Sequence, residues 1–176
     1  MKKTKLYLLF VSLASFLALL IPSAGTNGNG RMHPNGDNGA GGWGKKLGMD
    51  NERLKKLIER LATIVEGELG FWRVRYKERE LFIITDENHN RMRIMTPITE
   101  EEKLTEHHLR LVLLANFDRA LDAKYALASD YLWSTFTHPL AELTDDQFID
   151  AFKQVNRLAD TYGGSYSSTD LIFGGG

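Results

Sequence analysis

The chain has 176 residues, of which 22 are lysine or arginine and 23 are aspartate or glutamate, so its formal net charge is −1. This balance argues against a nucleic-acid ligand, which requires a basic surface. The absence of cysteine excludes disulfides, thiolate metal sites and a cysteine nucleophile. Stability must therefore come from an ordinary hydrophobic core.

The N-terminal segment has the features of a secretory signal peptide. The basic stretch MKKTK precedes an apolar run from Leu6 to Ile21, and the small residues Ser23 and Gly25 follow it. We predict a signal peptide at residues 1–25 and an exported protein, periplasmic or extracellular. An uncleaved membrane anchor is the alternative, although the apolar run is short for a span, which needs about twenty residues.

Residues 26–49 are rich in glycine and asparagine and poor in apolar side chains. This composition buries too little surface to offset the entropy of ordering, so it predicts a flexible linker. The glycines at 174–176 predict a flexible tail. Residues 50–173 then have the size of a single domain.

The first predicted element of that domain is an amphipathic helix. The segment 50–69, DNERLKKLIERLATIVEGEL, places apolar residues at helical spacing and charged residues on the opposite side, and Gly70 follows it. Because the polar face mixes both charge signs, we expect the helix to pack on a core rather than on a membrane.

The next elements are strands, because the hydrophobic period changes to two. FWRVRYK at 71–77 alternates apolar and basic residues, and the runs at 79–85 and 91–95 follow after short connections. They predict an antiparallel meander of three strands. We expect Pro97 to end the third strand, and Thr99 with Glu102 to form the capping box of a second helix.

This second helix is apolar on two sides. Leu104, Leu111 and Ala115 share one stripe, while a second stripe at i, i+4 and i+8 lies nearly opposite and contains Leu109, Leu113 and Phe117. A helix that packs on one face does not need a second stripe. Either this helix is buried centrally, or its second face docks onto another chain.

The stretch KYALASDYLWSTFTHPL, residues 124–140, is compatible with a continued helix or with a hairpin. Asp118 would interrupt the buried face of a continued helix, and YLWSTFTH is rich in aromatic and β-branched residues, which favour strands. We predict strands at 124–128 and 131–138, joined by a turn at Ser129 and Asp130.

A last helix follows, opened by a capping box of Thr144 and Gln147 and ended by Gly163 and Gly164. The predicted order is α-β-β-β-α-β-β-α. This is an α+β fold, with an antiparallel sheet and helices packed mainly on one face.

The second half of the chain resembles the YbjN-like and Tir-chaperone-like superfamily, which shares the fold of class I type III secretion chaperones. The likeness rests on leucines just before Asn116, a strand that closes near PL, LTDDQF at 143–148 and ADTYG at 159–163. With the preceding elements it covers about residues 50–163. It implies a small, generally dimeric α+β domain that binds other polypeptides and has no known catalytic apparatus.

The resemblance also implies where the dimer forms, because these proteins tend to use the helix between the two groups of strands. In this chain that helix carries Leu109, Leu113 and Phe117. We therefore predict these three residues as the interface of a homodimer.

The sheet offers a second predicted binding surface. If Trp72, Val74 and Tyr76 face the helices, the intervening arginines point to the opposite face. The strand LFII is apolar on both sides, so either Leu81 and Ile83 or Phe82 and Ile84 must join those arginines. The predicted surface for an unidentified protein partner comprises Arg73, Arg75, Arg91, Arg93, Phe82 and Ile84. The alternative is an ordinary sheet face with salt bridges to Glu78, Glu80 or Asp86.

Glu106, His107 and His108 are the candidate metal ligands. Adjacent helical residues diverge by about 100°, so the two histidines do not readily share one ion. We predict no catalytic, cofactor or metal site. The leading hypothesis is a non-enzymatic, exported adaptor or chaperone-like protein that binds a protein partner as a homodimer. A membrane-tethered sensory or regulatory module and, less favoured, a metal-dependent hydrolase are the alternatives.

Overall fold

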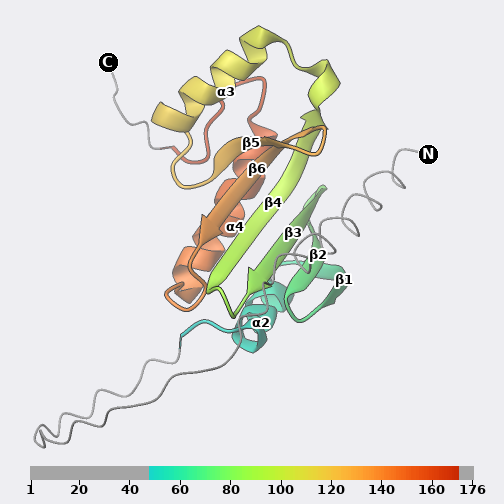
Figure 1. Cartoon of the computed structure of the whole chain (residues 1–176), viewed down its shortest axis with the longest axis vertical. Helices are drawn as coiled ribbons and strands as arrows, with labels where there is room; N and C mark the ends of the chain where they lie inside the picture. The colour runs from blue at the N-terminus through green and yellow to red at the C-terminus, as the bar shows by residue number, and fades with distance from the viewer. Residues whose placement is uncertain (1–47, 171–176) are drawn as a thin grey trace, which may run out of the picture. The chain divides into compact units, whose positions relative to one another are not determined.

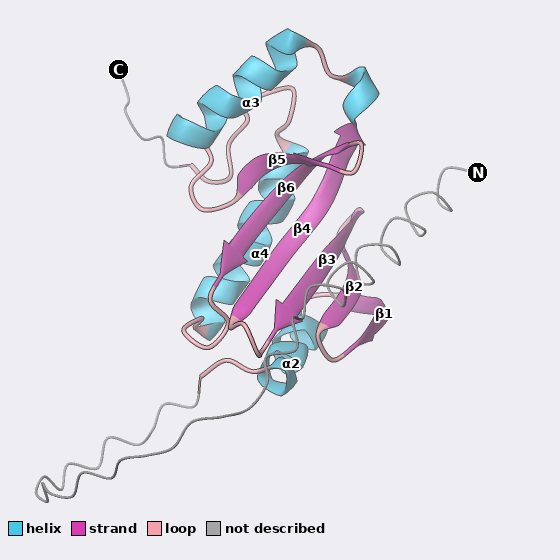
Figure 2. Cartoon of the chain, viewed as in Figure 1, coloured by secondary structure: helices cyan, strands magenta, loops and turns pink. Residues whose placement is uncertain are grey.

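The computed structural model describes residues 48–170. The predicted signal peptide, residues 26–47 of the predicted linker and residues 171–176 lie outside the described part. Within it, six strands form one antiparallel sheet in the order β1-β2-β3-β4-β6-β5, accompanied by three α-helices (Figures 1 and 2). The elements in chain order are α2 Asn51–Leu61, β1 Thr63–Glu68, β2 Phe71–Tyr76, β3 Arg79–Asp86, β4 Arg91–Glu100, a 3-10 turn Glu101–Lys103, α3 Glu106–Asp118, β5 Lys124–Ala128, β6 Tyr131–His138 and α4 Asp145–Asp160.

The first helix is shorter than predicted, and an additional strand follows it. Helix α2 ends at Leu61, and Ala62 has extended backbone angles. Thr63 to Glu68 then pair with β2 as strand β1. The prediction of helix through residue 69 is wrong because the β-branched residues of TIVEGE favour a strand once a pairing partner lies beside them.

Strand β4 is longer than predicted and ends differently. It continues through Pro97 to Glu100, with an irregularity in the register between Pro97 and Thr99. A β-bulge tolerates a proline, which lacks the N–H that a regular ladder needs. The predicted capping box of Thr99 and Glu102 is therefore wrong. Helix α3 is capped instead by Thr105, whose side chain accepts from the backbone N–H of His108.

The predicted hairpin is confirmed. Strands β5 and β6 have the predicted bounds, and Ser129 and Asp130 both have positive φ, 52° and 63°. Two consecutive left-handed residues form the turn whose twist matches that of the flanking strands. The capping box of Thr144 and Gln147 is also present at the start of α4.

One hydrophobic core joins the three helices to one face of the sheet. Helix α4 packs on β4 and β6, and α2 packs beside it on β1 (Figure 2). The buried side chains include Leu54 and Ile58 from α2, Val112 and Ala115 from α3, Phe148 and Phe152 from α4, and Trp72, Ile83, Ile94 and Leu132 from the strands. The predicted α+β class and the alternation of helices with groups of strands are confirmed, with one strand more in the first group.

Candidate protein-binding surfaces

The predicted dimer face lies on the outside of helix α3. Leu113 is 68% exposed and Phe117 86%, while Leu109 is half-buried. Val112 and Ala115 are the only buried side chains of this helix. Among the described residues this helix is therefore not buried centrally, and docking of its second face onto another chain stays a prediction. Leu114, 52% exposed, extends this surface; we call Leu109, Leu113, Leu114 and Phe117 the α3 face.

Polar contacts add to the burial of Val112 and Ala115 in holding the C-terminal half of α3. Asn116 pairs with the backbone of Tyr125: its Oδ1 accepts from the Tyr125 N–H at 2.8 Å, and its Nδ2 donates to the Tyr125 carbonyl at 3.1 Å. Lys124 Nζ donates to the carbonyls of Asn116 and Ala120 at 2.7 and 2.6 Å. The side chain of Asn116 therefore acts as a partner for edge strand β5 and ties α3 to the sheet. The sequence shows this asparagine but not its contact.

The loop between α3 and β5 is fixed by Gln154 of α4, which is 2% exposed. Gln154 Oε1 accepts from the backbone N–H groups of Asp122 and Ala123, at 3.0 and 3.3 Å. Its Nε2 donates to the carboxylates of Asp150 and Asp122, at 2.6 and 3.2 Å. One side-chain amide thus connects the last helix to the loop that orients α3.

The second predicted surface lies on the sheet face opposite the core. Cross-strand pairing places Arg73, Phe82 and Met95 in one row and Phe71, Ile84 and Arg93 in the next, and directly opposed residues share a face. Of the two apolar pairs, Phe82 and Ile84 therefore lie with the arginines. Leu81 and Ile83 belong to the core on the other side.

The middle of this outer face is already well packed. Phe82, Met95 and Trp133 are 2%, 6% and 5% exposed, and the rings of Phe82 and Trp133 meet edge to face with centroids 6.4 Å apart. Sequence reasoning missed Met95 and Trp133. Met95 and Trp133 alternate with core residues along β4 and β6, and this alternation places them on the opposite face of the sheet.

The charges on the outer face divide into two groups. Arg73 pairs with Glu66 at 3.1 Å and with Glu80 at 3.7 Å, and Arg75 pairs with Glu80 at 3.3 Å. These contacts match the salt-bridge alternative for this part of the face. Exposed pairs of this kind contribute little to stability.

Arg91 and Arg93 lie at the other end of the face and are exposed. Arg93 Nε donates to Thr137 Oγ1 at 3.1 Å, and Arg91 donates to the carbonyl of Asn90. Asp86 lies opposite Arg91, but its carboxylate accepts from the backbone and the ring of His89, which hold the pKa of Asp86 below its usual value. Among residues 48–170, neither arginine has a carboxylate within 4 Å.

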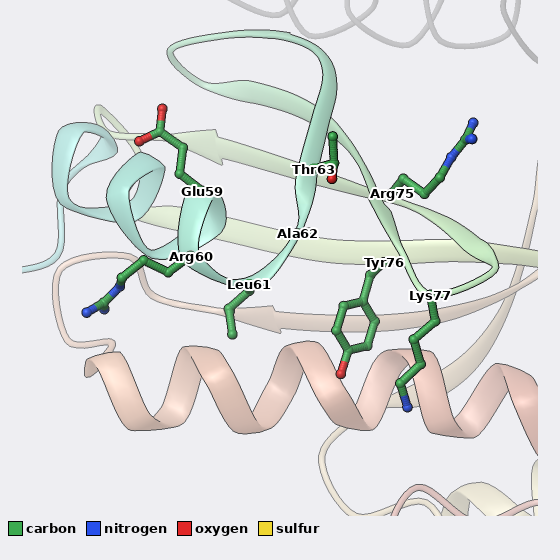
Figure 3. Close-up of a pocket in the computed structure, with 8 residues that line it drawn as sticks. All are labelled: Glu59, Arg60, Leu61, Ala62, Thr63, Arg75, Tyr76 and Lys77. Carbon is green, nitrogen blue, oxygen red and sulfur yellow. The ribbon is translucent and has the colours of Figure 1, made fainter.

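A hollow of about 460 Å³ lies where α2 passes into β1, beside β2. Figure 3 shows the side chains of Arg60, Arg75 and Lys77 pointing away from one another. Tyr76 points towards α4 and meets the ring of Phe152 at 5.1 Å. Because its charged groups do not converge on one point, this hollow has neither a charge cluster nor a nucleophile with a base.

The histidines of α3 do not converge either. Nδ1 of His108 accepts from the backbone N–H of Thr105 at 3.2 Å, and the rings of His107 and His108 lie 6.4 Å apart. Within residues 48–170 no three histidine or acidic side chains are grouped as a metal site. In the same range no helix has both the length and the apolar character needed to cross a membrane.

No family model matches the chain, and no curated protein matches its sequence. Solved structures do match its fold. The complex of the Yersinia pestis type III secretion chaperone SycH with a stable fragment of YscM2 gives a TM-score of 0.50 at 17% identity, covering 64% of this chain and 98% of that one. The HopA1–SchA chaperone–effector complex and the ExsC–ExsE complex each give 0.49, at 10% and 14% identity, over 65% of this chain and 89% and 94% of theirs.

The match to the SycH complex spans nearly the whole of that chain. At this level of identity the likeness concerns the fold and not the activity. The more specific resemblance to YbjN-like proteins stays a prediction. The chain has the fold of a type III secretion chaperone.

Proposed function

We propose that this chain is a non-enzymatic, exported protein-binding domain that acts as a homodimer. The observation that carries the proposal is the α3 face, where Leu113, Leu114 and Phe117 are each more than half exposed on one helix. Scattered apolar residues are normal on a surface, but a contiguous group of large ones is typical of an interface. The fold supports the protein-binding part of the proposal, since the SycH structure is that of a chaperone in complex with a protein fragment.

A second copy of the chain suits the α3 face because a two-fold axis would bury both copies of this apolar set together. Full burial of a Leu or Phe side chain contributes about 1.5–3 kcal/mol. Six such side chains from Leu113, Leu114 and Phe117 of two copies supply a gain of the order of 10 kcal/mol, before the costs of association are subtracted. This gross gain is of the same size as the cost of association, about 4–15 kcal/mol, so the rest of the contact must supply the net affinity.

Leu113→Glu tests the dimer by placing a charge at the centre of the α3 face. We expect a shift from dimer to monomer in light scattering, with an unchanged circular dichroism spectrum because Leu113 is exposed. Leu69→Glu is the matched control, since Leu69 is 53% exposed in the turn between β1 and β2. A monomeric parent, or a Leu113→Glu variant of unchanged mass, would contradict the dimer.

We assign the protein partner to the outer face of the sheet. Among residues 48–170 no carboxylate lies within 4 Å of Arg91 or Arg93, and Ile84 beside them is half-buried. A partner segment with acidic and apolar residues would complement this end of the face. Arg73 and Arg75, which are already paired with Glu66 and Glu80, border it.

The test of this surface is the double change Arg91→Glu and Arg93→Glu. Crosslinking in intact cells followed by purification should recover a partner with the parent and lose it with the variant. Lys55→Glu with Lys56→Glu, two exposed positions on α2, controls for net charge. Recovery of the same partner by the arginine variant would remove the outer face from the proposal.

Export is proposed from the basic and apolar pattern of residues 1–25. Mass spectrometry of the protein recovered from cell fractions measures the mature N-terminus. An N-terminus near Gly25 in an envelope or culture fraction agrees with export. A retained N-terminal segment in the membrane fraction would favour the tethered sensory module instead.

A further inference from the structure

The N-terminus of α3 is capped by a histidine. Thr105 Oγ1 accepts from the backbone N–H of His108 at 3.3 Å, and His108 Nδ1 accepts from the backbone N–H of Thr105 at 3.2 Å. This reciprocal pair is a capping box, in which the third helical residue is usually glutamate or glutamine. Helix α4 has the usual form of the box, with Gln147 in the place of the histidine. The chain thus contains one capping box whose acceptor can bind a proton and one whose acceptor cannot.

The bond from Thr105 determines which form of His108 the box requires. A backbone N–H only donates, so Nδ1 must carry a lone pair, and the proton of the neutral ring lies on Nε2. Nδ1 is therefore also unavailable to a metal ion. In acid both ring nitrogens are donors, and rotation of the ring restores no acceptor. Protonation removes the partner of the Thr105 N–H and adds a positive charge to the first turn of a helix, where the macrodipole disfavours it.

No close carboxylate offsets that charge. Among residues 48–170 the only histidine with a carboxylate within 4 Å is His89. On α3 itself, Glu106 lies in the same turn as His108, and the ring of His107, which can also become positive, lies 6.4 Å away. From the segment after α4, the ring of Tyr162 lies 6.4 Å from that of His108. This exceeds the distance of about 6 Å within which an aromatic face attracts a cation.

The titratable groups of the other neighbouring elements are engaged elsewhere. On β5, which packs on α3, Lys124 donates to carbonyls at the opposite end of the helix, and the hydroxyl of Tyr125 donates to a carbonyl of α4. Tyr166 packs on the ring of Tyr125, with centroids 6.2 Å apart. In the turn Glu101–Lys103 the lysine pairs with Glu100 at 2.8 Å, and both glutamates are exposed to water, which screens them. A proton on His108 is therefore not compensated by these groups.

We propose that His108 is an acid-sensitive cap that makes the α3 face respond to pH. At neutral pH the box holds the first turn of α3, in which the N–H of Leu109 donates to the Thr105 carbonyl at 3.1 Å. Leu109 belongs to the α3 face, so release of this turn displaces one of its four apolar side chains. The stabilisation by the cap is present while the ring is neutral. It is lost as the pH falls through the range in which histidine binds a proton, near about pH 6.5 for an unperturbed ring.

Hydrogen exchange of the full chain, compared at about pH 7.5 and about pH 5, measures the cap directly. The protection factors of the Leu109 and Arg110 amides, each corrected for the intrinsic rate at the same pH, should fall about tenfold in acid, since the cap is lost and a charge is added. The Phe148 amide is the reference within the same chain. It donates to the Thr144 carbonyl at 3.0 Å in the first turn of α4, whose box does not titrate, so its protection should not fall.

His108→Gln gives α3 the same box as α4. Protection at Leu109 in this variant should match the parent at neutral pH and should not fall in acid. His107→Gln removes the exposed neighbouring histidine and should behave as the parent does. Unchanged protection of Leu109 in the parent, or an equal fall in His108→Gln, would overturn the cap. The parent with its Phe148 reference decides the question even where the glutamine variant is perturbed.

The link from the cap to association rests on the proposed dimer and is measured separately. A first turn that is open about a tenth of the time at neutral pH is open about half of the time after a tenfold shift. Because the turn must be closed in both copies, the dimer dissociation constant should then rise about threefold in acid in sedimentation equilibrium. In His108→Gln it should not rise.

The outcomes separate the two proposals. An unchanged dissociation constant in the parent, together with lost protection at Leu109, would overturn the control of association by His108. A parent that is monomeric at both pH values but loses protection in acid contradicts the proposed dimer and supports the cap. A dimer whose protection at Leu109 does not depend on pH supports the proposed function and overturns the cap.

Discussion

Replacing Gln154 with leucine should destabilise the domain strongly, because this side-chain amide makes hydrogen bonds to four groups at once. It removes the acceptor of two backbone N–H groups, at Asp122 and Ala123, and Ala123 is completely buried. A buried donor without a partner costs about 1–3 kcal/mol. The expected loss in unfolding free energy is therefore about 2–5 kcal/mol, or a fall in melting temperature of about 10 °C or more.

Urea unfolding followed by circular dichroism measures this loss, and Gln154→Glu is the informative companion variant. Glutamate keeps the acceptor oxygen but adds a third carboxylate beside Asp122 and Asp150. Repulsion raises the folded-state pKa of this glutamate above its unfolded value of about 4.3. The folded state then binds more protons than the unfolded state in the window between the two values. The stability of the glutamate variant, relative to the parent, should therefore rise as the pH falls through that window.

Gln154→Leu carries no such group, so its loss should not change with pH in that window. A loss below about 1 kcal/mol in the leucine variant would refute the reasoning, since it would mean that the two N–H groups find other acceptors. Equal pH profiles for the two variants would refute the placement of the carboxylates.

Three further predictions concern stability. Ser129→Asn with Asp130→Gly should stabilise the domain by about 1 kcal/mol in urea unfolding, because both positions have positive φ and Asn-Gly is the preferred pair in such a turn. Burial raises the pKa of Tyr125 in the folded state, so the stability of the domain should fall as the pH rises above about 10, the pKa of an unfolded tyrosine. Tyr125→Phe should flatten that fall. It should also cost about 1 kcal/mol at neutral pH, because it removes the hydrogen bond to the Leu158 carbonyl. Thr144→Ala should cost about 1 kcal/mol by removing the cap of α4, and Thr144→Ser should restore most of it. A loss of stability in the Asn-Gly turn variant would contradict the first prediction. Equal falls in stability above pH 10 for the parent and Tyr125→Phe would contradict the second, and no loss in Thr144→Ala would contradict the third.

The sequence predicted the elements whose signals are local. The hairpin of β5 and β6 combines β-branched and aromatic residues with a two-residue turn, and its strands have the predicted bounds. The cap of α4 is equally local, because Thr144 and Gln147 satisfy each other's backbone groups. Such features need no knowledge of distant residues.

Strand β1 could not be predicted from its own period because its apolar residues also fit a helix. Its decisive contact is tertiary: a side chain at Gly67 would place Cβ 2.7 Å from the Phe71 carbonyl oxygen and 2.9 Å from the Trp72 ring. Glycine therefore allows β1 to lie close against β2, and a glycine within a strand is a known sign of close backbone approach. In a helix Gly67 would cost only about 1 kcal/mol relative to alanine, which is too little to exclude the helical prediction.

The candidate surfaces also combine features that the sequence predicts with features that it does not. Angles along a single helix predicted which face Leu109, Leu113 and Phe117 share, and alternation along the strands predicted where the arginines lie. Neither pattern indicates which ion pairs form, since Glu66 reaches Arg73 only because residues 63–68 are a strand. The burial of Met95 and Trp133 on the outer face likewise depends on the whole sheet.

The way α3 is held bears directly on the proposed function. Only two of its side chains are buried, and the pairing of Asn116 with Tyr125 fixes its C-terminal half. Gln154, through Asp122 and Ala123, orients the loop that follows. A helix that served only to complete the core would direct its leucines inward, because burial of an apolar side chain is the larger gain. The polar supports instead keep α3 in place while its apolar face points outward, as expected of a helix that presents this face to a second protein chain.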